Sequence, residues 1–313
     1  MIAVISLNPA LDVTHHVDGV DWSGVNRPAR VTTAPGGKGV NVARTLRALG
    51  TDALLLGLAG GAAGEALRAG LRAAAVPALL TEIAGETRRT FAVVDTRRAE
   101  VAIFNEPGPP ITPGEYASFL DGYRKAIADS CAVVLSGSLP PQLPPDAYAE
   151  LITIAIQAGV PALLDTSGAA LLPGVAAGPA VAKPNLAELA AAVGRPLDAH
   201  DLPAVLDAAH ELRGKGGDAV VVSMGQAGLL GVTSDGSWLA VPRPAVGNPT
   251  GAGDAVVAGL ARGLMLGWPW AERLRHATAL GAATAAAATA GEFGQDDYLS
   301  ALNDIHVTYV GTA

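Results

Sequence analysis

The sequence predicts an α/β protein whose mostly parallel central sheet is covered by helices on both faces, giving three layers, with a small β-sheet lid. Short apolar runs alternate with helical patterns along the chain, and this alternation is typical of parallel strands joined by helices. Residues 12–33 and 88–105 instead alternate apolar and polar residues, as short antiparallel strands do. We therefore expect one domain over residues 1–313, with lid strands inserted at about those two places.

The individual elements follow from the same patterns. The expected strands of the central sheet are residues 3–7, 52–58, 132–136, 162–164, 181–182 and 219–223. The expected helices are residues 40–49, 64–74, 148–158 and 186–192, and two expected lid strands are residues 90–95 and 100–104. Ligands in such folds gather where strands end at their carboxyl edge, so polar residues that follow a strand are the first candidates for a site.

The composition indicates which kinds of binding partner are unfavourable. The net charge is −8 and no long basic run is present, which disfavours nucleic acid and anionic membranes. The single cysteine, Cys131, cannot form a disulfide within the chain, and its apolar neighbours predict a buried thiol. Neither a signal peptide nor a membrane-spanning run is recognisable, so a cytoplasmic location is expected.

A glycine-rich turn at residues 247–254 (GNPTGAGD) runs directly into an apolar helical pattern. Backbone N–H groups of such a turn and the start of a helix attract an anion. Asp254, at the junction, is well placed to accept a proton from an attacking hydroxyl. The combination suits phosphoryl transfer, whereas the alternative is an ordinary loop in which Asp254 caps the helix.

A second glycine-rich turn, residues 35–44 (PGGKGVNVAR), also enters a helix. It is not a Walker A loop, because Gly39 follows Lys38, and it does not read G-x-G-x-x-G. Gly37 can bring the backbone close to a polyhydroxylated ligand, and Asn41 offers a hydrogen-bond donor and an acceptor. A tight turn without a ligand is the alternative.

Charged residues beside the lid segments suit a phosphorylated substrate. Asp12 follows the first strand and would bind sugar hydroxyls or stabilise a turn. Arg27, Arg88, Arg89 and Lys38 come from separate segments and would converge on a phosphate group, unless they are solvated surface charges.

Three further segments lie at strand ends. Asn185 and Glu188 are three residues apart, so they form a capping box or face nucleotide phosphate and metal-bound water. Residues 223–228 (SMGQAG) would place backbone near nucleotide phosphates or ribose, and residues 136–140 (SGSLP) end another strand in the same way. Ser138 lacks the G-x-S-x-G context of a hydrolase nucleophile, and the histidines show no metal-ligand spacing.

Together these segments resemble the ribokinase/PfkB superfamily of sugar kinases over essentially the whole chain, and within it the 1-phosphofructokinase and tagatose-6-phosphate kinase branch. The matching segments are LNPALD (7–12), PGGKGVNVARTLRALG (35–50), GETR (85–88), NEPGPPI (105–111), LSGSLPP (135–141), LDTSGAAL (164–171), AKPNLAEL (182–189), VVSMGQAGLL (221–230) and NPTGAGDAVVAGL (248–260). So many segments in the right order are far more specific than any one of them. The resemblance implies a ribokinase-like fold in a single PfkB-type kinase domain.

The resemblance also implies roles for matching residues. Asp254 would be the catalytic base, and the N–H groups of Gly251, Ala252 and Gly253 would form the anion hole. The substrate-binding residues would be Asp12, Arg27, Gly37, Lys38, Asn41, Arg88 and Ser138, with Arg89 as the alternative to Arg88. The residues on the ATP side would be Lys183, Asn185, Glu188, Ser223, Gly225 and Gly228. Mg²⁺ would be held mainly by nucleotide phosphates and water, with Glu188 as its candidate protein contact.

The implied activity is ATP-dependent transfer of the γ-phosphate to a hydroxyl of a ketohexose phosphate, giving a bisphosphate. Asn248-Pro249 and the tail at residues 277–293 look most like tagatose-6-phosphate kinases, so tagatose 6-phosphate and fructose 1-phosphate rank above fructose 6-phosphate. The alternatives are a kinase for an unphosphorylated sugar or nucleoside, which the cations disfavour, and a non-catalytic sugar-phosphate sensor, which the intact GAGD turn disfavours. Relatives often dimerise through lid strands, so a homodimer is also expected.

Overall fold

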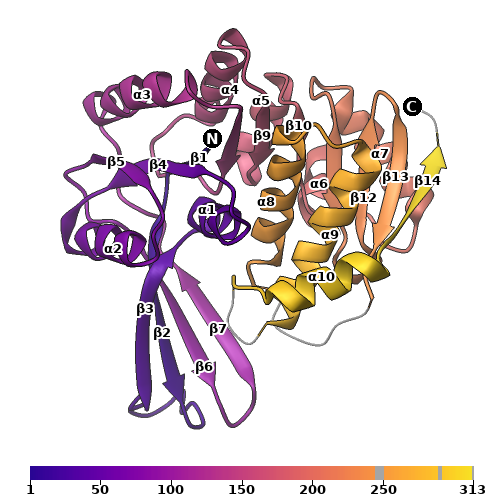
Figure 1. The fold of residues 1–313 in the computed structure, drawn as a ribbon. Helices are drawn as coiled ribbons and strands as arrows, with labels where there is room; N and C mark the ends of the chain where they lie inside the picture. Colours follow the sequence, from indigo (N-terminus) through magenta and orange to yellow (C-terminus); the bar gives the residue numbers. More distant parts are fainter. Residues whose placement is uncertain (244–249, 288–290, 312–313) are drawn as a thin grey trace.

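A large twisted sheet forms the centre of the computed structural model, which describes residues 1–243, 250–287 and 291–311 (Figure 1). Ten strands of the described residues build it. In spatial order they are β14 (His306–Gly311), β13 (Gly236–Val241), β12 (Leu229–Thr233), β11 (Val220–Ser223), β10 (Val181–Ala182), β9 (Ala162–Asp165), β8 (Ala132–Ser136), β1 (Ile2–Ser6), β4 (Ala53–Ala59) and β5 (Ala78–Glu82). The strands from β11 to β5 are parallel, and β12, β13 and β14 extend the sheet with antiparallel pairs.

Helices cover both faces of this sheet, so the predicted three-layer fold is confirmed (Figure 1). One face carries α1 (Lys38–Ala48), α2 (Gly61–Ala73), α8 (Ala252–Met265), α9 (Trp270–Ala286) and α10 (Gln295–Asp304). The other carries α3 (Pro113–Ile127), α4 (Ala147–Gln157), α5 (Leu171–Ala176), α6 (Leu186–Val193) and α7 (Leu202–Arg213). Two short 3₁₀ turns are η1 (Gly168–Ala170) and η2 (Gly225–Ala227).

Strand β1 shows why both faces are covered. Its side chains alternate between the two apolar cores: Ile2 and Val4 pack under one layer of helices, and Ala3 and Ile5 pack under the other. A strand with apolar residues on both sides can be stable only when both sides are shielded from water.

A second sheet of four strands projects from the body next to α1 and α2 (Figure 1). Its order is β3 (Arg30–Gly36), β2 (Ala10–Val17), β6 (Arg89–Asp95) and β7 (Glu100–Asn105). These strands occupy the two segments predicted for the lid. The expectation of antiparallel pairing is corrected at the centre of the sheet, where β2 and β6 are parallel. The reason is topological: they follow β1 and β5, two parallel-running strands of the large sheet, and leave the body in the same direction.

The environment of Cys131 differs from the prediction. The residue is exposed, and its Sγ lies 3.1 Å from the backbone oxygen of Met1. The buried stretch of β8 begins only at Ala132, so the cysteine stands at the surface before the strand enters the core. No helix in the described part of the chain combines the length and the apolar character needed to cross a membrane.

Candidate active site

A cavity of about 870 Å³ lies between the carboxyl edge of the large sheet and the small sheet. It brings together residues from distant segments: Asp12, Gly37, Lys38, Asn41, Arg88, Ser138, Lys183, Asn185, Ser223, Gly251, Gly253 and Asp254, all of which the sequence predicted as site residues. The small sheet contributes Thr90, Ile103 and Asn105 to the wall. The strand ends, the glycine turns and the small sheet therefore meet at one cavity, as the sequence predicted.

A second cavity of about 560 Å³ adjoins the first on the far side of the start of α8. Asn185, Ser223 and Gly253 line both cavities, so they form the boundary between them. Of the predicted nucleotide residues and anion-hole residues, Gly225, Gly228 and Ala252 line only this second cavity, together with the apolar side chains of Leu229 and Val256. The first cavity, which has most of the charged side chains, and the second thus meet at one helix terminus.

The start of α8 is shaped by its glycines. Gly251 caps the helix with φ +85°, in the left-handed region that favours glycine. Gly253 faces open space, because a Cβ there would meet nothing within 4 Å. The first N–H groups of a helix lack intrahelical acceptors and carry partial positive charge. This helix terminus therefore offers an accessible anion-binding surface.

Asp254, the third residue of α8, lines the large cavity. Its side chain is buried, and the Nδ2 of Asn41 donates a hydrogen bond of 2.8 Å to its Oδ2. Burial and the negative charge of Asp165 raise the pKa of Asp254 to about 7, although Asn41, Lys38 and Lys183 oppose the rise. A carboxylate with this pKa changes protonation near neutral pH, as a general base requires.

Sequence reasoning assigned no role to Asp165, yet this residue organises the charges of the site. It is fully buried at the end of β9, with its Oδ1 3.0 Å from Lys183 Nζ and its Oδ2 3.6 Å from Lys38 Nζ. Ser136 Oγ donates a further hydrogen bond of 3.1 Å to Oδ2. Burial alone would raise the pKa of Asp165, but the two lysines outweigh it and hold the pKa below its usual range. Asp165 therefore stays ionised and raises the pKa of Lys38.

The structure distinguishes the two adjacent arginines. Arg88 lines the large cavity, and its Nε donates a 3.0 Å hydrogen bond to the backbone oxygen of Asn8. Arg89 is not among the lining residues and pairs at 3.5 Å with Glu86. The geometry therefore favours Arg88 as the guanidinium that meets a substrate phosphate.

Asp12 stands on the same side of the cavity as Arg88. Burial raises its pKa, whereas a hydrogen bond with Thr90 and the charges of Arg88 and Arg44 lower it. A carboxyl group that is partly shielded from water, next to a guanidinium, suits hydrogen bonding to sugar hydroxyls.

Some predicted residues are not brought to the cavities. Arg27 is exposed in the loop between β2 and β3 and lines neither cavity. Glu188 forms the capping box predicted as its alternative role: its Oε2 accepts a 2.8 Å hydrogen bond from the backbone N–H of Asn185. Gly247, Asn248 and Pro249 lie outside the described residues. The roles of Arg27 and Glu188 toward phosphate and Mg²⁺ stay predictions.

Comparison with known proteins identifies the family. The sequence model of the pfkB family carbohydrate kinases matches residues 4–295. The chain belongs to this family. The predicted membership of the ribokinase/PfkB superfamily is thus confirmed, and the cavity described above is the candidate active site of a pfkB family kinase.

Several relatives of this kinase are phosphofructokinases. It is 39% identical over 285 residues to the ATP-dependent 6-phosphofructokinase isozyme 2 of Mycobacterium tuberculosis, covering 90% of this chain and 83% of that protein. Phosphofructokinase-2 from Escherichia coli in complex with fructose-6-phosphate has a similar structure, with a TM-score of 0.87, 32% identity and coverage of 97% and 98%. A possible 1-phosphofructokinase from Thermotoga maritima gives a TM-score of 0.88 with 25% identity and coverage of 99% of both chains. The chain is thus a phosphofructokinase-type sugar kinase.

Proposed function

We propose that this kinase transfers the γ-phosphate of ATP to the C1 hydroxyl of a ketohexose 6-phosphate, with fructose 6-phosphate as the preferred acceptor. The observation that carries the proposal is one cavity that holds a buried carboxylate with a pKa near 7 and, on another wall, the guanidinium of Arg88. The relatives support fructose 6-phosphate, because in structural comparison the identity to phosphofructokinase-2 in complex with fructose-6-phosphate is 32% and that to the possible 1-phosphofructokinase is 25%. Tagatose 6-phosphate and fructose 1-phosphate, which the sequence ranked first, become the competing substrates.

In this proposal Asp254 accepts the proton of the sugar hydroxyl. The hydroxyl oxygen forms a bond to the γ-phosphorus while the bond from that phosphorus to the β–γ bridging oxygen breaks, and ADP leaves with the electron pair. The N–H groups at the start of α8 would stabilise the negative charge on the transferring group, because Gly251 and Gly253 line the cavity and a helix start carries partial positive charge.

The nucleotide would occupy the second cavity and place its phosphates at the boundary with the first. Ser223, Gly225 and Gly228 would lie along it, and the apolar side chains of Leu229 and Val256 would face the base. Mg²⁺ bound with the nucleotide would supply positive charge to the β- and γ-phosphates. Within the described residues no cluster of three or more His, Cys, Asp or Glu side chains could hold a metal, and we propose that phosphates and water hold most of the ion.

The small sheet would also mediate a homodimer. Val31, Val101 and Phe104 on its edge strands are each about half exposed, which is unusual for residues of this size. Phosphofructokinase-2 from Escherichia coli, 31% identical, has a tetrameric inhibited form. The cytoplasmic location expected from the sequence is part of the same proposal.

The proposal is tested by measuring Mg²⁺- and ATP-dependent ADP release with a panel of acceptors. The panel contains fructose 6-phosphate, tagatose 6-phosphate, fructose 1-phosphate, free fructose, ribose and adenosine. The highest kcat/KM is expected for fructose 6-phosphate. Preference for fructose 1-phosphate would overturn the assignment of the acceptor hydroxyl, and turnover of neutral acceptors alone would overturn the phosphosugar site.

Replacing Arg88 with Ala should raise KM for the phosphosugar by ~10- to 100-fold, because hydrogen bonds to charged groups contribute roughly 1.5–3 kcal/mol each. The KM for ATP should stay close to that of the wild type. Steady-state kinetics with each substrate varied in turn measure both constants. Arg89→Ala is the matched control, since Arg89 pairs with Glu86 away from the cavity lining. Equal changes in both KM values, or a larger effect at Arg89, would contradict the assignment.

A further inference from the structure

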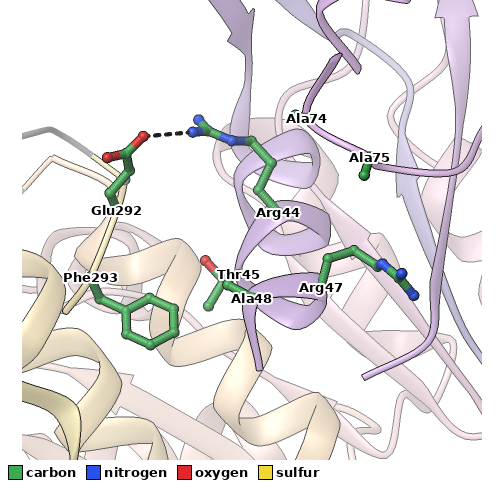
Figure 2. Close-up of a pocket in the computed structure, with 9 residues that line it drawn as sticks. Arg44, Thr45, Arg47, Ala48, Ala74, Ala75, Glu292 and Phe293 are labelled. Carbon is green, nitrogen blue, oxygen red and sulfur yellow. Dashed lines mark hydrogen bonds and ion pairs between the residues drawn. The ribbon is translucent and has the colours of Figure 1, made fainter. Parts of the chain in front are cut away.

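An ion pair links α1 to residues 291–294, the segment that precedes α10. This segment lies close to the glycine turn at the start of α8. The Nη2 of Arg44 lies 3.1 Å from Oε1 of Glu292. A cavity of about 450 Å³ lies beside this contact (Figure 2). Figure 2 shows Arg44 extending to Glu292, whereas Arg47, one turn later on α1, points away from it and pairs with Asp52 at 2.9 Å. The two arginines therefore share a cavity but serve different partners.

Gly291, which precedes Glu292, packs directly on the proposed anion-hole turn. Its N–H donates a hydrogen bond of 3.1 Å to the backbone oxygen of Thr250. A Cβ on Gly251 would lie 2.6 Å from the Cα of Gly291, so the two backbones touch with no room for a side chain. A Cβ on Gly291 would in turn meet Asn41, whose side chain holds Asp254, at 3.6 Å. The segment thus contacts the turn and lies next to the residue that orients the base.

The segment is anchored at its two sides by different means. The ring of Phe293 packs edge-on against Tyr298 of α10, with centroids 6.1 Å apart, and joins the apolar core. On the side of α1 the cavity lies between the segment and the chain at Ala74 and Ala75, so close packing does not fix it there (Figure 2). The Arg44–Glu292 ion pair supplies a link on that side.

We propose that Arg44 and Glu292 are positioning residues for phosphoryl transfer: their ion pair holds Gly291 against Thr250 and Gly251 and thereby fixes the turn that binds the transferring phosphoryl group. An ion pair with one partner half exposed contributes little to global stability. Catalysis is more sensitive, because a displacement of about 1 Å near the reacting atoms can lower a rate by ~100-fold. The inference rests on the proposed function of the turn.

The first test is kinetic. Arg44→Ala and Glu292→Gln should each lower kcat by about tenfold while KM for both substrates changes by less than about threefold. The double variant should be no slower than either single variant, and the charge swap Arg44→Glu with Glu292→Arg should recover part of the loss. Arg47→Ala is the matched control, expected to keep kcat within about twofold because its partner Asp52 lies away from the turn.

The second test does not depend on turnover. Amide hydrogen exchange at Gly291 and Ala255, whose N–H groups donate to the backbone oxygens of Thr250 and Gly251, should be faster in Arg44→Ala and Glu292→Gln than in the wild type, and unchanged in Arg47→Ala. Unchanged exchange in both variants would overturn the inference even in an active kinase. A slow Arg44→Ala beside a normal Glu292→Gln would also overturn it, and would place the effect of Arg44 at Asp12, whose pKa it lowers. Altered exchange in a protein without kinase activity would reject the proposed function instead.

Discussion

The variant Asp254→Asn is expected to lose ~10²- to 10⁴-fold in kcat, the usual contribution of a general base. The amide keeps the shape of the side chain but cannot accept the proton of the attacking hydroxyl. ATP binding should change little, because the cavity proposed for the nucleotide is lined by other residues. ADP release in the presence of fructose 6-phosphate measures the first effect, and titration calorimetry with ATP measures the second.

The same variant should also be more stable than the wild type at about pH 8. A rise of the Asp254 pKa from 3.8 to about 7 corresponds to ~4 kcal/mol of unfavourable free energy when the buried carboxylate is ionised. Folding then favours the protonated form, so the stability of the wild type falls as pH rises from about 4 to 7, and the amide removes this dependence. Asp207→Asn, an exposed change on α7, is the control. Retained turnover in Asp254→Asn would reject Asp254 as the base.

Replacing Asp165 with Asn should destabilise the protein by about 3–5 kcal/mol, because Lys183 is itself buried and would lose its counter-charge. Activity should change in a characteristic way. In the wild type kcat/KM is expected to fall below about pH 7 as Asp254 becomes protonated. The charge of Asp165 raises the pKa of Asp254, so its removal should move this limb of the profile to lower pH.

Urea unfolding and a pH series of kcat/KM measure the two effects separately. Glu211→Gln provides the contrast for stability, since its pair with Arg195 is about 40% exposed on both sides and should contribute little to the free energy of unfolding. If the fall in kcat/KM of Asp165→Asn stays near pH 7 or moves to higher pH, Asp165 does not set the protonation of Asp254.

The sequence predicted the parallel strands well because they are buried on both faces and read as short apolar runs, as in β1 and β8. It did not predict β5, which is partly exposed, or the antiparallel edge formed by β12, β13 and β14. An edge strand such as β14 has no continuous apolar run, since its burial is mixed along its length. Its place in the sheet depends on pairing with β13, which no local pattern reveals.

The residues of the candidate site were also predicted only in part. Position at the end of a strand or in a glycine turn was enough to select Asp12, Lys38 and Asp254, which the fold brings to one cavity. Asp165 occupies an equivalent position at the end of β9 and could have been found by the same rule. The choice between Arg88 and Arg89 needed coordinates, because adjacent residues differ only in the direction their side chains take.

The small sheet has a consequence for how the chain folds. Its central pair joins β2 to β6, and β3, α1, β4, α2 and β5 all intervene between them in the chain. Contacts between such distant segments close slowly, because the loop must lose its entropy before the pairing stabilises it. We expect the small sheet to be completed only after β1, β4 and β5 have paired in the large sheet, because β2 and β6 continue from β1 and β5. A folding intermediate without the small sheet would lack the wall of the cavity formed by Thr90, Ile103 and Asn105, and that side would still be open to water.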